Sequence, residues 1–175
     1  MNRMSSLLER LIQAVADWMA RCIPEYEPAA WNDGGPIQHW NNCYNYACDL
    51  PTGTYAQPGR AAGSMYASID CVEVGKGAQA DGLTSTNCAE GCGCSECCHL
   101  VALAIWPQPH AFDNVDYHWY RRDRDGKWSH KPGGTPATNL DNSGNVITDP
   151  QTADRGPYTV FCGCYCVCKE NVTVN

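Results

Sequence analysis

The sequence predicts an α+β domain, with helices in its first half and an antiparallel sheet in its second half. Apolar residues recur at helical spacing near the N-terminus, and a second short helical pattern follows a loop. Apolar and aromatic runs bounded by turn residues then fill the second half, as is typical of strands. The 175 residues suffice for one ordinary domain. We therefore expect an amphipathic helix within residues 1–23 and a single domain over residues 24–175.

The helices are predicted from periodicity and from their caps. Apolar residues from Leu7 to Met19 lie at helical spacing, and Pro24 ends this first helix. Residues 24–35 are rich in turn formers. A second helix begins near Asn42 or Cys43, since asparagine is a good N-cap, and ends by Pro51. The ranges that follow are a loop over 51–69, a short helix or strand over 68–74, and a loop over 75–93.

Four strands are predicted in the second half. The run 99–106 is short, apolar and closed by Pro107, which fits a buried strand. A second strand covers 116–122, a turn at 124–126 follows, and a third strand starts at Lys127. The last strand covers 157–168.

The charge pattern excludes some classes of function. The formal net charge is −7, whereas nucleic-acid and anionic-membrane binders usually present basic patches. The one basic cluster, residues 121–124, is interrupted by an acid and is interpreted as a solvated strand end. No stretch is long and apolar enough to span a membrane. We also find no secretory signal, so the chain is expected to be cytoplasmic or delivered by a non-classical route.

Thirteen cysteines are unusual for a cytosolic protein and indicate either disulfides or a thiolate metal site. Alternate residues of a strand share one face, so the last strand presents a ladder of thiols that need partners in another segment. We expect the two cysteine clusters to lie together, as disulfides or as a structural zinc site. The clusters are Cys88, Cys92, Cys94, Cys97 and Cys98, followed by Cys162, Cys164, Cys166 and Cys168.

Cys43 stands apart from both clusters. A helix N-terminus supplies positive potential that lowers the pKa of a thiol, so Cys43 is the candidate nucleophile. His99, at the start of an apolar strand, is the candidate base, and His118 on the next strand is the candidate orienting residue.

This order of cysteine, histidine and histidine resembles the NlpC-like branch of the papain-like cysteine peptidases and amidases. Gln38, five positions before Cys43, matches the place of their oxyanion-hole glutamine. The phrases around Cys43, His118 and His130 also resemble uncharacterised bacterial and phage proteins assigned as cysteine peptidases, over roughly residues 37–166. The resemblance implies a papain-like fold and a hydrolase that cuts an amide or acyl bond through a thioester, with no cofactor. It implies a peptide, protein or peptidoglycan-like substrate.

Several alternatives stay open. His130 can replace either histidine, and Asp116 can orient the base instead of His118. His99 directly follows Cys97 and Cys98, so a zinc site would take the base away. A deamidase or an acyltransferase would use the same thioester chemistry. A non-catalytic, cysteine-rich structural or binding module is the alternative of another class, because a cysteine in an aromatic segment is often a buried structural residue.

Overall fold

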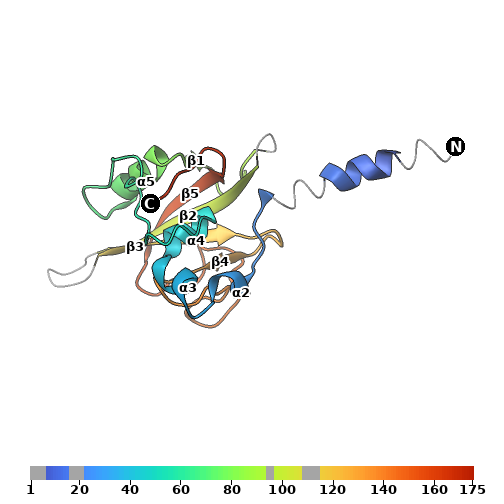
Figure 1. Cartoon of the computed structure of the whole chain (residues 1–175). Helices are drawn as coiled ribbons and strands as arrows, with labels where there is room; N and C mark the ends of the chain where they lie inside the picture. Colours follow the sequence, from blue (N-terminus) through green and yellow to red (C-terminus); the bar gives the residue numbers. More distant parts are fainter. Residues whose placement is uncertain (1–6, 16–21, 94–96, 108–114) are drawn as a thin grey trace.

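A five-stranded antiparallel sheet follows a series of short helices, which confirms the α+β class (Figure 1). The computed structural model describes residues 7–15, 22–93, 97–107 and 115–175. The strands lie in the order β1-β5-β2-β3-β4. The last strand in the sequence therefore lies inside the sheet, between β1 and β2.

The strands agree closely with the ranges predicted from the sequence, apart from β1, which falls in a predicted loop. Residues Cys98 and Cys168 are Cα partners in the pairing of β2 with β5, which brings two cysteines face to face. The strands are β1 (Thr84–Thr86), β2 (Cys98–Trp106), β3 (Asp116–Arg122), β4 (Trp128–His130) and β5 (Val160–Cys168).

The helices differ more from the prediction. The loops predicted over 24–35 and 75–93 contain helical residues, because α2 forms in the first and α5 extends into the second. The described helices after residue 22 are α2 (Pro28–Trp31), α3 (Pro36–Trp40), α4 (Cys43–Cys48) and α5 (Cys71–Ala80).

Glycines explain why the sequence predicts a short helix or strand over 68–74 and a loop after it, where α5 continues to Ala80. Asp70 caps this helix by accepting hydrogen bonds from the backbone N–H groups of Val72 and Glu73. Gly75 and Gly77 weaken the helical pattern, but both are needed for close packing. A Cβ atom on Gly75 would lie 2.4 Å from the Tyr165 hydroxyl, and one on Gly77 would lie 2.7 Å from the backbone oxygen of Pro58. Tertiary contacts therefore override the low helix propensity.

The N-terminal helix is described over residues 7–15, within the range predicted from the sequence. Its large apolar side chains are exposed, between 55% and 61%, on the described residues. The remainder of the predicted helix and the domain boundary near residue 23 stay predictions. Within the described ranges, no helix combines the length and the hydrophobicity needed to cross a bilayer.

Buried clusters cover both faces of the sheet. One face packs against α4 and α5 through Val101, Leu103 and Trp119, and the other packs through Leu100, Ala102 and Trp128. The alternation along β2 follows from the twofold period of a strand. Because both faces are covered, β2 is apolar from Leu100 to Trp106 rather than alternating with polar residues.

A bulge in β5 changes the face on which one cysteine lies. The pairing register shifts between Leu103 and Ala104, opposite Gly163, whose φ is +122°. Cys162 consequently packs on the face of α4 and α5, whereas Cys164 and Cys166 pack on the opposite face. The predicted one-sided ladder is therefore correct only beyond the bulge.

Candidate functional site

Cys43 is the first residue of α4 and lines a small, partly open cavity of about 120 Å³, whose lining includes the exposed Tyr55. The helix begins here because the Asn42 side chain accepts hydrogen bonds from the N–H groups of Tyr44 and Asn45. The thiol is only 5% exposed. Burial raises the pKa of Cys43 to about 12, although the backbone N–H of Trp119 acts in the opposite direction. Burial therefore favours the protonated thiol over the thiolate.

His118 lines the same cavity, and a hydrogen-bond chain fixes its protonation. Nε2 of His130 lies 3.0 Å from the carbonyl oxygen of Leu140, which can only accept, so Nε2 carries the proton. The Nδ1 atom of His130 is then an acceptor, and Nε2 of His118 donates to it over 2.7 Å. Burial is the main cause that lowers the pKa of His118 well below its ordinary value, and the nearby His130 adds to it. The structure thus pairs His118 with His130.

His99 lies elsewhere. Its Nε2 donates a hydrogen bond to the carbonyl oxygen of Ala47, at 2.7 Å, one turn along α4 from Cys43. The ring is 2% exposed, and its buried Nδ1 has no hydrogen-bond partner among the described residues. Burial lowers the pKa of His99 to about 4. The ring lines a separate cavity with Cys92 and Cys98, so the structure brings His118, and not His99, into the cavity of Cys43.

Of the two remaining candidate residues, Asp116 lies at the cavity of Cys43 and Gln38 does not. Asp116 lines the cavity of Cys43, where its carboxylate accepts a hydrogen bond of 2.8 Å from the Tyr158 hydroxyl. Gln38, half-buried on α3, is not one of the residues that line this cavity. Its backbone oxygen instead accepts a hydrogen bond from the buried ammonium group of Lys131.

Five disulfides join the strand β5 and the N-terminal segment to the remainder of the fold. Every cysteine of β5 is bridged to a segment at least seventy residues away in the chain. Cys43 and Cys48 are the free cysteines of the described ranges, and both are buried. The bridges are Cys22–Cys97, Cys71–Cys162, Cys88–Cys164, Cys92–Cys166 and Cys98–Cys168.

The expectation that the two clusters lie together is confirmed, since three of these bridges join them. Of the two products that the sequence left open, the structure contains disulfides. A zinc site would need thiolates, which bridged sulfurs cannot provide. Cys94, which was included among the candidate ligands, lies outside the described residues. The roles of Cys22 and Cys71 were not found from the sequence, because both cysteines lie outside the clusters.

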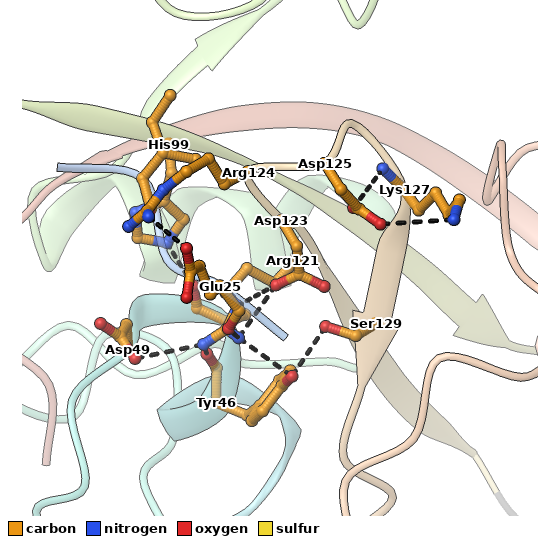
Figure 2. Close-up of polar contacts among 12 residues, drawn as sticks. Glu25, Tyr46, Asp49, His99, Arg121, Asp123, Arg124, Asp125, Lys127 and Ser129 are labelled. Atoms are coloured by element: carbon orange, nitrogen blue, oxygen red, sulfur yellow. Dashed lines mark hydrogen bonds and ion pairs between the residues drawn. The ribbon is translucent and has the colours of Figure 1, made fainter. Parts of the chain in front are cut away.

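Arg121 connects three segments and was also missed (Figure 2). Its guanidinium group donates to the carboxylates of Asp123 and Asp49 and to the backbone oxygen of Glu25, and it stacks 4.1 Å above the ring of Tyr46. Arg121 and Asp123 are 1% and 3% exposed, so the prediction of a solvated strand end is wrong for these two residues, although Arg122 and Arg124 are exposed. The burial of Arg121 could have been predicted from the twofold period of β3. This period places Arg121 and Trp119 on the same face of the sheet, and α4 covers that face.

The comparisons with known proteins point away from an enzyme. No protein-family model and no solved structure matches the chain, so a papain-like fold is not confirmed. The chain is 49% identical over 142 residues to insoluble matrix shell protein 1 of Ruditapes philippinarum. The match covers 81% of the chain and 88% of that relative.

This relationship corrects four predictions made from the sequence. The resemblance to NlpC-like peptidases and to bacterial or phage proteins is wrong, and so are the hydrolase function and the assignment as an enzyme. The expectation of a cytoplasmic protein is also wrong, given a shell matrix relative and five disulfides. At this level of identity and coverage, the chain belongs to the family of insoluble matrix shell protein 1.

Proposed function

We propose that this protein is a non-catalytic, disulfide-stabilised structural component of an extracellular matrix of the shell type. The relationship to a matrix shell protein carries this proposal. The five disulfides support it independently, because disulfides form and persist in oxidising compartments outside the cytosol. The partners are then other matrix molecules, in place of the peptide substrate expected from the sequence.

The state of the Cys43 cavity supports a structural role for the thiol. Attack on a carbonyl requires a thiolate, usually paired with an imidazolium ion. Burial favours the neutral forms of both Cys43 and His118, as the directions of their pKa values indicate. Cys43 then serves as a small apolar residue in the core between α4 and the sheet.

Localisation tests the proposal directly. In tissue of the source organism, antibodies raised against the oxidised protein should detect it in the extracellular matrix. The same antibodies should detect little protein in the cytosolic fraction. Peptide mapping without reductant should recover the bridges of β5 from the matrix material. Cytosolic protein with reduced thiols would contradict the proposal.

Thiol reactivity separates the structural role from the catalytic one. A Cys94→Ser background removes the one cysteine outside the described residues, which leaves Cys43 and Cys48 free. With a low dose of fluorescent iodoacetamide, we expect neither thiol to react in the folded protein and both to react in guanidinium chloride. A Cys43→Ser variant provides the matched control. Fast and selective labelling of Cys43 in the folded protein would argue against a purely structural thiol.

A further inference from the structure

Two adjacent cysteines connect the two ends of the described fold. Cys97 is bonded to Cys22, at the start of the described range 22–93, and Cys98 is bonded to Cys168, at the end of β5. A covalent path therefore runs from Cys22 to Cys168 through two disulfides and one residue-to-residue step. Residues 23–96 and 99–167 lie in closed loops beside this path.

From this connectivity we propose that the protein bears tension as an inextensible link, in which the disulfide path carries the load and the core and the sheet carry none. The proposal rests on the proposed matrix role for its setting, whereas the connectivity stands on the bridges alone. Hydrogen bonds and apolar contacts of an ordinary domain yield when its ends are pulled. In this protein a force applied at Cys22 and Cys168 acts on covalent bonds, and the non-covalent contacts of the fold do not bear it.

The geometry limits the extension tightly. The Cα atoms of the two bridged pairs lie 4.6 Å and 4.1 Å apart. Even with both disulfides stretched to the upper end of their usual range, Cys22 and Cys168 stay within roughly 17 Å of each other. The backbone between them would reach roughly 500 Å if it were free to extend.

The path is protected unequally at its two ends. If the Cys98–Cys168 bridge is lost, the load can pass from Cys97 back to Cys92 and across the Cys92–Cys166 bridge, a detour of a few residues. If the Cys22–Cys97 bridge is lost, the next connection upstream is Cys71–Cys162. Residues 23–70 then enter the load path. The structure therefore assigns the Cys22–Cys97 bridge as the critical one.

Single-molecule stretching of the full chain, with handles attached through peptide tags at both ends, tests this proposal. The oxidised wild-type protein should show no unfolding step from residues 22–168. A Cys22→Ser, Cys97→Ser variant should release roughly 180 Å, from the extended length of the residues that enter the path. The matched Cys98→Ser, Cys168→Ser variant should release only roughly 20 Å, because of the short detour.

Reductant provides a measurement that does not depend on the folding of any variant. The wild-type protein without reductant should show no unfolding step between residues 22 and 168. After reductant is added, stretching should show unfolding steps whose released lengths sum to several hundred ångströms. Steps of this size in the oxidised wild-type protein would overturn the proposal, and so would similar releases from the two double variants. These outcomes are independent of where the protein is found in tissue, so they do not depend on the test of the proposed function.

Discussion

Burial of His99 makes the free energy of unfolding depend on pH. Its imidazole has a pKa of about 4 in the folded protein, because burial disfavours the charged form. An unfolded chain binds a proton at this residue below about pH 6.5. The contribution of His99 to the free energy of unfolding is therefore complete above pH 6.5 and is lost as the pH falls from 6.5 towards 4.

We expect the urea midpoint of the wild-type protein to fall over this interval. A His99→Gln variant keeps an N–H donor for the Ala47 carbonyl but does not titrate, so its midpoint should depend less on pH. The difference between the two proteins should reach at most about 3 kcal/mol by pH 4. His39→Gln, at an exposed position on α3, is the control. Parallel pH profiles for wild-type protein and His99→Gln would show that His99 is not the source.

Arg121 shows how one buried charge organises its neighbours. Its guanidinium group meets the carboxylates of Asp123 and Asp49 at 2.9 Å and 3.1 Å. The hydroxyl of Tyr46 accepts a further hydrogen bond from it and shares a hydrogen bond of 2.7 Å with the hydroxyl of Ser129, which lies on β4 (Figure 2). Removing the guanidinium group would leave Asp123 buried and without its counter-charge.

Arg121→Ala should therefore lower the free energy of unfolding by about 3–5 kcal/mol, the usual cost of breaking a buried ion pair from one side. Arg122→Ala removes the same side chain at the next, exposed position and should change stability by less than about 0.5 kcal/mol. Urea denaturation of both variants measures the difference. Equal stability of the two would mean that the interactions of Arg121 contribute little.

At the scale of elements, the bulge of β5 decides how the disulfides are distributed. By turning Cys162 towards α5, it lets one strand form bridges on both faces of the sheet. Gly163 permits the bulge, because a φ of +122° is disfavoured for any residue with a Cβ atom. No other group lies within 4 Å of a Cβ built on Gly163, so a substitution would act through backbone strain alone.

Gly163→Ala should consequently lower the free energy of unfolding by about 1–3 kcal/mol. Gly93→Ala is the control, since Gly93 also has open space around its Cβ position and has no positive φ. Thermal unfolding under oxidising conditions measures both variants. If the two midpoints coincide, the positive φ of Gly163 does not constrain the bulge.

The disulfide between Cys88 and Cys164 fastens a loop to the face of the sheet opposite α4 and α5. Replacing both cysteines by alanine should lower the free energy of unfolding by about 2–3 kcal/mol, because the neighbouring Cys92–Cys166 bridge leaves only a short loop for this bridge to close in the unfolded chain. Guanidinium denaturation without reductant, with peptide mapping of the four remaining bridges, checks this value. An unchanged midpoint would show that the other bridges already hold the loop in place.

For the whole molecule, local patterns were sufficient to predict four of the five strands and insufficient to predict β1 and the function. Strands β2 and β3 follow directly from apolar and aromatic runs, and α4 follows from the cap at Asn42. Only the start of α5 could be predicted, as a short helix or strand, because the glycines of its second half are explained only by the contacts they make with distant segments.

The site shows the same limit. Cys43 was placed correctly at a helix start and His118 on a strand, yet the sequence pattern gave no measure of burial. Burial decides whether a thiol and an imidazole are charged, and therefore what chemistry they can perform. The pairings of Cys22 and Cys71 depend on which loops lie over which strand, and spacing along the chain does not encode that.

The paired bridges at Cys97 and Cys98 also have a consequence for the durability of the protein. Any single backbone cleavage between residues 23 and 167 leaves both fragments attached to one another through at least one disulfide. After a single cut within residues 23–167, a gel without reductant should therefore keep the band near 19.2 kDa, and a gel with reductant should show two fragments. A protease in the surroundings can therefore cut each molecule once between residues 23 and 167 without releasing either fragment.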